Sequence, residues 1–382
     1  MARPATGTIV EKRYEQRRQP NRPVSRRWLW VISWLNLAAV LGVWGLLWGV
    51  ADDYWIGTAL LYLPRFPFAL PAAVLIPLAF KRDRRAILLN LVAVAIVIGP
   101  VMGLRLNVAG AMLAVPEKSV TAVSCNVQFF RPDFASVTKE VFSFHPDVIA
   151  FQDAKESHPL LEPFFRGWNV VHEGEFLIAS KHPLKLVAQC ETQVYERLTA
   201  IMCEVADPAG PFRVVSLHHM SPREGLSSIR PGDILAEAGD RPVDQELILR
   251  GEEAAAVRDF IEQNRGELPL LVMGDFNFPV ESQLYQSNWG DMTNTFDAGG
   301  LGYGYTILCT TRSLWPSGWP WCRIDHIVAS PEWDVQRAWA GSSNGSDHRC
   351  MAAVLNRLPG FKVSPSADAK KSPGATEKAK PN

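Results

Sequence analysis

Polar side chains lie at one end of five apolar runs in the C-terminal two thirds of the chain and in the middle of a sixth, 322–330. The runs cover residues 120–126, 147–153, 212–219, 268–277, 322–330 and 345–355, and each has the composition of a β-strand. Their polar residues are Asn126, Gln152, Asp153, His218, His219, Asp275, Asn277, Asp325, His326, Asp347 and His348. Apolar strands that carry carboxylates, amides and imidazoles in this way are typical of a site at one end of a sheet.

The chemistry of this set favours a hard cation and a phosphoester. Asp and Asn oxygens are the ligands of Mg²⁺, which binds them at about 2.0–2.1 Å and keeps several waters. The set has no thiolates and no three-His group, so zinc is less favoured. Imidazole titrates close to neutral pH and can orient a phosphate or transfer a proton. Metal, His and carboxylate together fit phosphoester hydrolysis, in which the metal stabilises phosphoryl charge and a carboxylate or His activates water.

Each motif also has a plain structural explanation. GDFN (274–277) has the residues of a turn after a buried strand, and SDH (346–348) has those of a helix N-cap. A pair such as His218 and His219 is more often part of the packing or the surface than of a site. Asp325 is harder to explain in this way because a buried carboxylate needs a partner. The joint occurrence of the motifs in this order is what points to catalysis.

The elements that must position these residues form an α/β domain over residues 119–357. Helical periodicity covers 133–145 and 244–264, and Val257, Phe260 and Ile261 form an apolar face of the second helix. Residues 105–118 are predicted to be a linker. Residues 358–382 are predicted to be a disordered tail, because they have almost no apolar content from position 362 onward.

The composition of the whole chain is balanced in charge. Its 382 residues include 39 basic and 39 acidic side chains, and 47% of the residues are apolar. The balance argues against a strongly cationic nucleic-acid binder and against a polyacidic tail protein. The apolar content is sufficient for a sizeable core.

Three apolar stretches before the α/β domain predict a transmembrane region over residues 28–104. They cover 28–50, 57–80 and 86–104, and the first has 23 residues without a charge. A helix needs about 20 apolar residues to cross about 30 Å of hydrocarbon. A cleaved signal peptide is disfavoured, because the first run is too long and two more follow. The alternative for each stretch is a buried core helix, and in the second stretch Arg65 must reach an interface or a partner.

Basic residues predict the orientation of these helices. The tail 1–27 and the loop 81–85, with sequence KRDRR, carry an excess of Lys and Arg, whereas the loop between the first two stretches carries Asp52 and Asp53. Positive charge stays on the cytoplasmic side. We therefore expect a multi-pass protein of the cell membrane with an extracytoplasmic catalytic domain. If residues 57–80 did not span, that domain would face the cytoplasm instead.

The chain has six Cys and no CxxC pair, which argues against a structural zinc site. In an extracytoplasmic domain some of them would be able to form disulfides. The pair we consider is Cys309 and Cys322, which flank a loop rich in Trp and Pro. The alternative is that most of the Cys are small, buried apolar residues.

The motifs taken together resemble a known family. In chain order they are SCNVQ, PDVIAFQD, VVSLHH, GDFN, IDHI and SDH. This order resembles the endonuclease/exonuclease/phosphatase (DNase I-like) superfamily, including its membrane-anchored bacterial members. The resemblance implies an α/β fold, a four-layer sandwich of two mixed β-sheets flanked by helices, with a metal-dependent site at one end of the sheets.

The resemblance also implies roles for the polar residues. Asn126, Asp153 and Asp347 would hold the metal, which is Mg²⁺ with Mn²⁺ as an alternative. His218 would contact or protonate the phosphate region. Asp275 and Asn277 would position the attacking water and stabilise the transition state. Asp325 would orient His348, which would act as a base or an electrostatic stabiliser.

One position departs from the family pattern. Asp153 stands where the family usually has Glu, and its shorter side chain would lose a direct metal contact unless the strand moves or a water intervenes. Weaker metal binding, a preference for a larger cation and loss of activity are the alternatives. His219 stands where the family often has an apolar residue, so the sequence leaves open which of the two His acts.

The sequence leaves the substrate open. Arg223, Arg230 and Arg241 lie in a loop after His218 and suit phosphate recognition, although a solvated loop explains them equally well. Aromatic residues in 309–321 would stack on bases or meet lipid. The leading hypothesis is a membrane-anchored Mg²⁺-dependent phosphodiesterase or nuclease, acting on nucleic acid or on a phospholipid headgroup. A lipid phosphodiesterase or phosphatase and a non-catalytic envelope binding module are the alternatives, and no protein partner is inferred.

Overall fold

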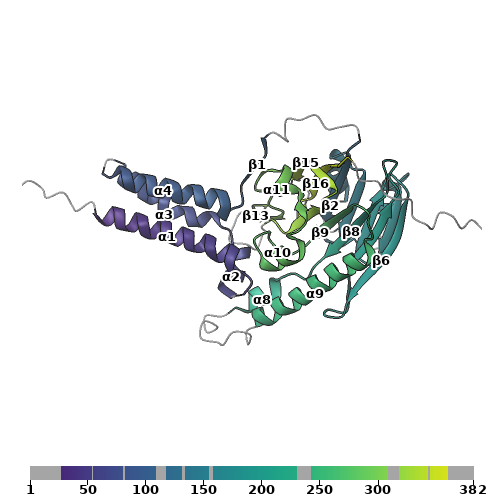
Figure 1. The fold of residues 1–382 in the computed structure, drawn as a ribbon, viewed down its shortest axis with the longest axis horizontal. Coiled ribbons are helices and arrows are strands. Elements are labelled where there is room, and N and C mark those ends of the chain that lie inside the picture. Colours follow the sequence, from purple (N-terminus) through teal and green to yellow (C-terminus); the bar gives the residue numbers. More distant parts are fainter. Residues whose placement is uncertain are drawn as a thin grey trace, which may run out of the picture. The chain divides into compact units, whose positions relative to one another are not determined.

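The computed structural model divides the chain into two compact units. It describes residues 27–53, 55–80, 82–108, 118–130, 134–154, 158–229, 242–308, 318–342 and 345–359. One unit comprises Met1–Val43 and Phe66–Ile98, and the other comprises Trp44–Arg65 and Gly99–Asn382. Figure 1 shows the fold, coloured along the sequence from purple at the N-terminus to yellow at the C-terminus.

The first unit is built from apolar helices. They are α1 (Arg27–Gly49), whose last turns belong to the second unit, the short η2 (Phe66–Ala69), α3 (Leu70–Ala79) and α4 (Arg84–Ile96), which continues into a π-helical turn, η3 (Val97–Val101). Buried amides link α1 to α4, because Asn36 Nδ2 donates to Asn90 Oδ1 at 3.0 Å and Asn90 Nδ2 donates to Ser33 Oγ at 2.8 Å. Polar side chains often join helices in this way inside membranes.

In the part of the chain that the structure describes, two helices are long and apolar enough to cross a membrane, namely Arg27–Gly49 and Arg84–Val101. The second apolar stretch of the sequence forms α2 (Trp55–Tyr62) and then η2 with α3, so it counts as a third span only if the two pieces are taken as one broken span. Pro64 explains the interruption, because proline has no N–H to donate and disfavours helical geometry at the preceding residue.

The second unit contains two six-stranded mixed sheets. The first sheet has the order β15-β16-β2-β3-β5-β4, and the second has the order β10-β14-β9-β8-β7-β6. The strands of the first sheet are β2 (Val120–Asn126), β3 (Val148–Gln152), β4 (Asn169–Glu173), β5 (Phe176–Ser180), β15 (Trp333–Ala340) and β16 (Met351–Arg357). The strands of the second sheet are β6 (Leu184–Thr192), β7 (Arg197–Val205), β8 (Phe212–His218), β9 (Leu270–Asp275), β10 (Thr293–Asn294) and β14 (Asp325–Ala329).

Helices cover the outer faces of the sheets, which gives four layers. Residues of both sheets, such as Val148, Ile178, Val214 and Met273, form the apolar layer between them. On the first sheet α6 (Phe134–Ser143) and α7 (Leu161–Phe164) pack on the outer face. On the second sheet α9 (Pro242–Asn264) and α10 (Gln283–Trp289) do so, and Figure 1 shows α9 running along this sheet. The predicted four-layer α/β sandwich is confirmed.

The remaining elements of the second unit are short. They are β1 (Arg105–Leu106), η4 (Gln128–Phe130), α8 (Arg223–Ser228), α11 (Thr295–Gly299), β11 (Leu301–Gly302), β12 (Ile307–Leu308) and β13 (Pro320–Cys322). The six expected strands and two expected helices are present. Two details differ from the sequence-based expectation. Asp325 is the first residue of β14 and does not lie in its middle. Residues 345–350 form a bend and a single bridge at His348, and β16 begins only after them.

The topology brings the polar strand ends to one edge. Strands β2 and β3 are parallel, with Asn126 opposite Gln152 at their ends, and β8 and β9 are parallel, with His218 opposite Asp275. Strand β14 is antiparallel to β9, so its first residue, Asp325, lies opposite Asp275. The carboxyl ends of four strands and the beginning of a fifth therefore meet at the same end of the sandwich.

Candidate active site

Asp275 lies at the centre of the site. It ends β9, and only 2% of its side chain is exposed. Its Oδ2 accepts a hydrogen bond from Asn126 Nδ2 at 3.2 Å. The same oxygen lies 3.6 Å from Nε2 of His218 and 3.8 Å from Nε2 of His348. One carboxylate oxygen therefore faces an amide and an imidazole from the ends of two other strands, and a second imidazole from the bend before β16.

Asp325 holds His348 from behind. Its two carboxylate oxygens lie 2.9 Å and 3.2 Å from Nδ1 of His348, and its backbone N–H donates to Thr306 Oγ1 at 3.2 Å. Burial lowers the pKa of His348, but the carboxylates of Asp325 and Asp275 outweigh burial and raise the pKa well above its usual value. The raised pKa favours the protonated imidazole, whose Nε2 lies 3.8 Å from Asp275 Oδ2.

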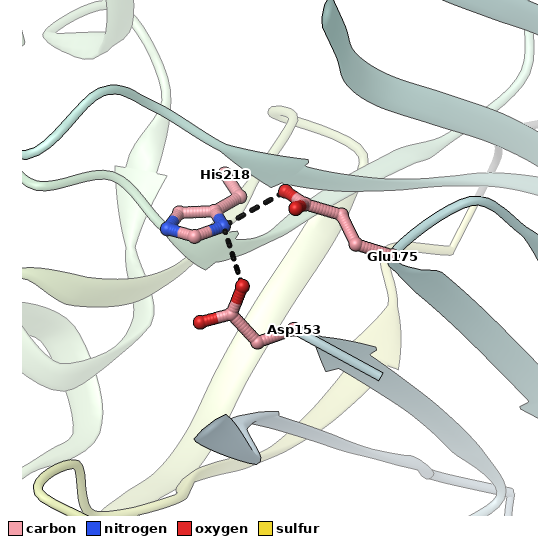
Figure 2. Close-up of side chains that lie close together, drawn as sticks. All are labelled: Asp153, Glu175 and His218. Carbon is pink, nitrogen blue, oxygen red and sulfur yellow. Dashed lines mark hydrogen bonds and ion pairs between the residues drawn. The ribbon is translucent and has the colours of Figure 1, made fainter. Parts of the chain in front are cut away.

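Two carboxylates lie beside Nδ1 of His218 (Figure 2). Its Nδ1 lies 2.9 Å from Glu175 Oε1 and 3.7 Å from Asp153 Oδ1. Burial lowers the pKa of His218, but the hydrogen bond to Glu175 and the charges of Asp275 and Asp153 raise it above its usual value. Arg197 Nη1 also contacts Glu175, at 3.2 Å. Burial opposes ionisation of Glu175, yet His218 and Arg197 lower its pKa below the usual value.

Asp153 and Asn277 adopt left-handed backbone conformations, with φ of 53° and 51°. Asp153 directly follows β3, and Asn277 lies two residues after the end of β9. Such geometry in a non-glycine residue stores strain that is common at functional sites. The backbone N–H of Asn277 donates to Asp275 Oδ1 at 3.0 Å, and its Nδ2 donates to the His219 carbonyl at 2.7 Å. Burial and the nearby Glu175 raise the pKa of Asp153 above its usual value, against the opposing charge of His218.

The structure distinguishes the two adjacent His residues. His218 faces Asp275, whereas His219 is fully buried on the other side, where its Nδ1 lies 3.3 Å from Glu253 Oε2. His326 is also fully buried, with Nε2 2.8 Å from the Phe278 carbonyl, and burial lowers its pKa to about 4. Because the backbone alternates across a strand, only one of two neighbouring side chains points into the site. His219 and His326 therefore support the site from behind.

A cavity of about 730 Å³ opens over this cluster. The predicted site residues that line it are Asn126, Asp153, His218, Asp275, Asn277, Asp347 and His348. Asp325 lies behind His348 and reaches the cavity only through it. Asp347 lines the cavity, but among the described residues it belongs to neither group of side chains with a spacing suited to one metal ion.

Glu175 is a site residue that we did not expect from the sequence. It lies between β4 and β5 in a turn, where a carboxylate is unremarkable. Gln152, by contrast, points away from the site, because its Nε2 donates to Ser216 Oγ at 2.9 Å between the two sheets. Of the loop residues considered for phosphate recognition, Arg223 lines the cavity. Arg230, Arg241 and Cys309 lie outside the described residues, so the suggested pairing of Cys309 with Cys322 stays a prediction.

Two groups of side chains suit a metal ion by their chemistry. One is Asp153, Glu175 and His218, and the other is Asp275, Asp325 and His348, with ligand atoms within 4.8 Å of one another in each group. The carboxylate oxygens suit a hard cation. In the first group the mutual repulsion of Asp153 and Glu175 raises the pKa of Asp153, and a bound cation would relieve it. The residues present therefore fit a divalent metal.

The model of the endonuclease/exonuclease/phosphatase family matches residues 123–348, which is more than half of the chain. The chain belongs to this family. As a member of the endonuclease/exonuclease/phosphatase family, it is a hydrolase that acts on phosphoesters.

Solved structures of endonuclease/exonuclease/phosphatase proteins are similar to this chain at low identity. A family protein from Bacteroides thetaiotaomicron is 18% identical, with 62% of this chain and 97% of that chain covered and a TM-score of 0.42. A 3′ phosphatase from Neisseria, bound to a product DNA hairpin, is 17% identical, with 61% and 98% covered and a TM-score of 0.46. An AP endonuclease from Archaeoglobus fulgidus is 15% identical, with 62% and 99% covered and a TM-score of 0.45. The chain has no significant match among curated proteins.

Proposed function

We propose that the chain is a membrane-anchored, divalent-metal-dependent phosphoesterase, and that the metal is Mg²⁺ or Mn²⁺. One observation carries the proposal. Two carboxylate-oriented imidazoles, His218 and His348, face the buried carboxylate of Asp275 at 3.6 Å and 3.8 Å within one cavity. Surface packing does not explain such an arrangement, because each ring is already oriented by its own carboxylate and still points its second nitrogen at a third.

Asp153 and Glu175 would hold the metal, with Asn126 beside it, and the metal would neutralise charge on the phosphoryl oxygens. Asp275 accepts the proton of the attacking water, and burial favours that role because it raises the pKa of the carboxylate to about 6. The Asn277 N–H fixes the orientation of the Asp275 carboxylate. His348, oriented by Asp325, stabilises the negative phosphoryl oxygens through Nε2. His218, oriented by Glu175, donates a proton on the leaving-group side.

The charge of the cavity favours a compact phosphoester, such as a phospholipid headgroup, over a nucleic-acid strand. Apart from His218 and His348, the one basic side chain among the described residues that line the cavity is Arg223. The acidic lining residues are Asp153, Glu224, Glu246, Asp275 and Asp347. A nucleic-acid backbone is bound through several Lys and Arg contacts to successive phosphates. The apolar lining residues Phe129, Met220 and Leu249 suit a headgroup that enters together with part of its lipid.

Chain connectivity supports an extracytoplasmic catalytic unit. Residues 44–65 and the chain from 99 onward both belong to the second unit, so the segment 66–98 leaves this unit and returns to it. That segment crosses a membrane twice or not at all, and both alternatives leave the catalytic unit on the same side. If α1 crosses the membrane, the unit would lie opposite the basic N-terminal tail, which the excess of positive charge would keep in the cytoplasm.

The test uses the full-length protein in detergent or in lipid nanodiscs. Hydrolysis of bis-p-nitrophenyl phosphate, of phospholipids and of plasmid DNA is measured with Mg²⁺, with Mn²⁺ and with EDTA. We expect metal-dependent turnover of the small diester and of phospholipid, and little or none of DNA. Turnover of DNA alone would instead identify a nuclease. No metal-dependent turnover of any substrate would favour the envelope binding module. A C-terminal reporter that is active only outside the cytoplasm tests the orientation.

A further inference from the structure

The loop that follows β9 is held by the segment that follows α1. The loop carries Asn277 and runs to Ser282, at the beginning of α10. The hydroxyl of Tyr62, the last residue of α2, donates to the Asn277 carbonyl at 2.8 Å. Arg250 Nη2 donates to the same carbonyl at 2.6 Å and to the Tyr62 hydroxyl at 3.0 Å. Tyr62 and Arg250 therefore fix one peptide group of the loop together.

A buried ion pair forms a second attachment. Arg65 and Glu281 are 6% and 5% exposed, and their side chains meet through Nη1–Oε1 at 2.6 Å and Nη2–Oε2 at 3.3 Å. Arg65 also donates to the carbonyls of Val101 at 2.9 Å and Leu61 at 3.1 Å. Burial raises the pKa of Glu281, but Arg65 outweighs burial and lowers it below the usual value. Both charges are fully partnered, as a buried pair requires.

Asp52 forms a third attachment, at the end of the loop. Its Oδ2 accepts from Ser282 Oγ at 2.5 Å and from the Leu284 N–H at 2.9 Å. Ser282 is itself the N-cap of α10, where its Oγ accepts from the Tyr285 N–H at 3.3 Å. The segment thus contacts the loop at three places. Tyr62 binds it near its start, Arg65 binds it near its end, and Asp52 binds the beginning of the helix that follows.

The first of these attachments lies directly behind the reacting groups. Asn277 has a left-handed φ of 51°, and its N–H donates to Asp275 Oδ1. A change in the backbone torsion angles of Asn277 would therefore shift its N–H relative to the Asp275 carboxylate and release the strain stored at this residue. Because Tyr62 binds the carbonyl of the same residue, on the next peptide group, it opposes a change in these angles.

We propose that residues 52–53 and 55–65 are a positioning element of the active site, in which Tyr62 sets the geometry of Asp275 through Asn277 while Arg65 and Asp52 hold the rest of the loop. The proposal rests on the proposed function for its catalytic part. It makes the segment between the apolar helices a component of the phosphoesterase and not only a tether. Tyr62 is a positioning residue, since it acts on Asp275 through Asn277.

The test compares Tyr62→Phe with Tyr305→Phe in the full chain. Tyr305 is a matched control, because its hydroxyl also donates to a backbone carbonyl. That carbonyl belongs to Met102, at 2.7 Å, and not to the loop that follows β9. We expect Tyr62→Phe to lower kcat by about 10-fold with little change in KM, because a small displacement of a catalytic group is costly in rate. Hydrogen exchange of the backbone amides in 275–282 should also become faster. Tyr305→Phe should change neither quantity.

Each outcome decides one claim. Unchanged amide exchange and unchanged kcat in Tyr62→Phe would overturn the positioning element. Faster exchange with unchanged kcat would overturn it as well, since the contact would then be structural only. If the wild-type protein hydrolyses no phosphoester, the proposed function fails. The exchange measurement then still decides whether Tyr62 holds the loop.

Discussion

Oε1 of Glu175 lies 2.9 Å from Nδ1 of His218, although the two residues are 43 positions apart in the chain. This contact leaves Nε2 of His218 directed at Asp275. The same arrangement recurs at His348, whose Nδ1 lies 2.9 Å from Asp325 Oδ2. The site therefore contains two oriented imidazoles, of which only the second has a partner that the sequence motifs suggested.

The first prediction concerns Glu175. Replacing Glu175 with Gln should lower kcat by roughly 10- to 100-fold, the range found when a residue that orients a ligand or a catalytic group is lost. Gln keeps the size of the side chain but loses the charge that favours the protonated form of His218. Steady-state hydrolysis of bis-p-nitrophenyl phosphate measures the effect. Glu173→Gln, at the end of β4 and outside the cavity, is the control. Equal rates for the two variants would show that the contact in Figure 2 has no catalytic role.

The second prediction concerns the opposite side of the cavity. His348→Ala and Asp275→Asn should each reduce kcat by at least about 10²-fold, the usual scale for acid–base groups. His182→Ala is a matched control, because this imidazole also lies near a carboxylate, that of Asp207 at 3.6 Å, but outside the cavity. Near-normal turnover in both site variants would refute the proposed site.

The sequence was sufficient to predict the α/β domain and seven of the residues that line the cavity for a physical reason. Buried strands such as 120–126 and 270–275 are continuous apolar runs, and a polar residue at the end of such a run is unusual enough to be noticed. Asn126, Asp153, His218, Asp275 and His348 all stand at such ends. Parallel pairing then brings those ends to one edge.

Residues whose position depends on tertiary contacts could not be predicted in this way. Glu175 occupies a turn, where a carboxylate is ordinary. It reaches His218 only because the two sheets pack against each other. Arg65 was recognised as needing a partner, but Glu281 lies 216 positions away in a loop without a distinctive pattern. The choice between His218 and His219 required the direction in which each side chain leaves β8.

The third prediction concerns pH. Burial and the charge of Asp325 raise the pKa of Asp275 to about 6, while His348 and His218 oppose the rise. If Asp275 must be ionised to accept a proton, kcat falls as the pH falls through about 6. Asp325→Asn removes a negative neighbour, so it should lower the pKa of Asp275 and move the fall in kcat to lower pH. His218→Gln removes a positive neighbour, so it should raise this pKa and move the fall to higher pH. Normalised pH profiles of kcat measure both shifts, and a shift of both variants in one direction would exclude Asp275 as the titrating group.

The fourth prediction concerns the metal. If Asp153 and Glu175 share one cation, chelation with EDTA should abolish turnover and added Mg²⁺ or Mn²⁺ should restore it. Asp153→Asn and Glu175→Gln should each raise the metal concentration for half-maximal activity by about 10-fold or more, because each removes a charged oxygen ligand. Glu224→Gln is the control, since Glu224 lines the same cavity outside either group of potential ligands.

The two site variants also separate the possible consequences of the short side chain at position 153. Glu175 is able to supply the metal contact that the short side chain of Asp153 would lose. If it does, Glu175→Gln should weaken activation by Mg²⁺ more than activation by Mn²⁺, because the smaller Mg²⁺ tolerates less geometric error. Titrations of activity with each metal measure this difference. Identical titrations for wild type and both site variants would place the cation elsewhere, and the second group, around Asp275 and Asp325, would then be the remaining candidate among the described residues.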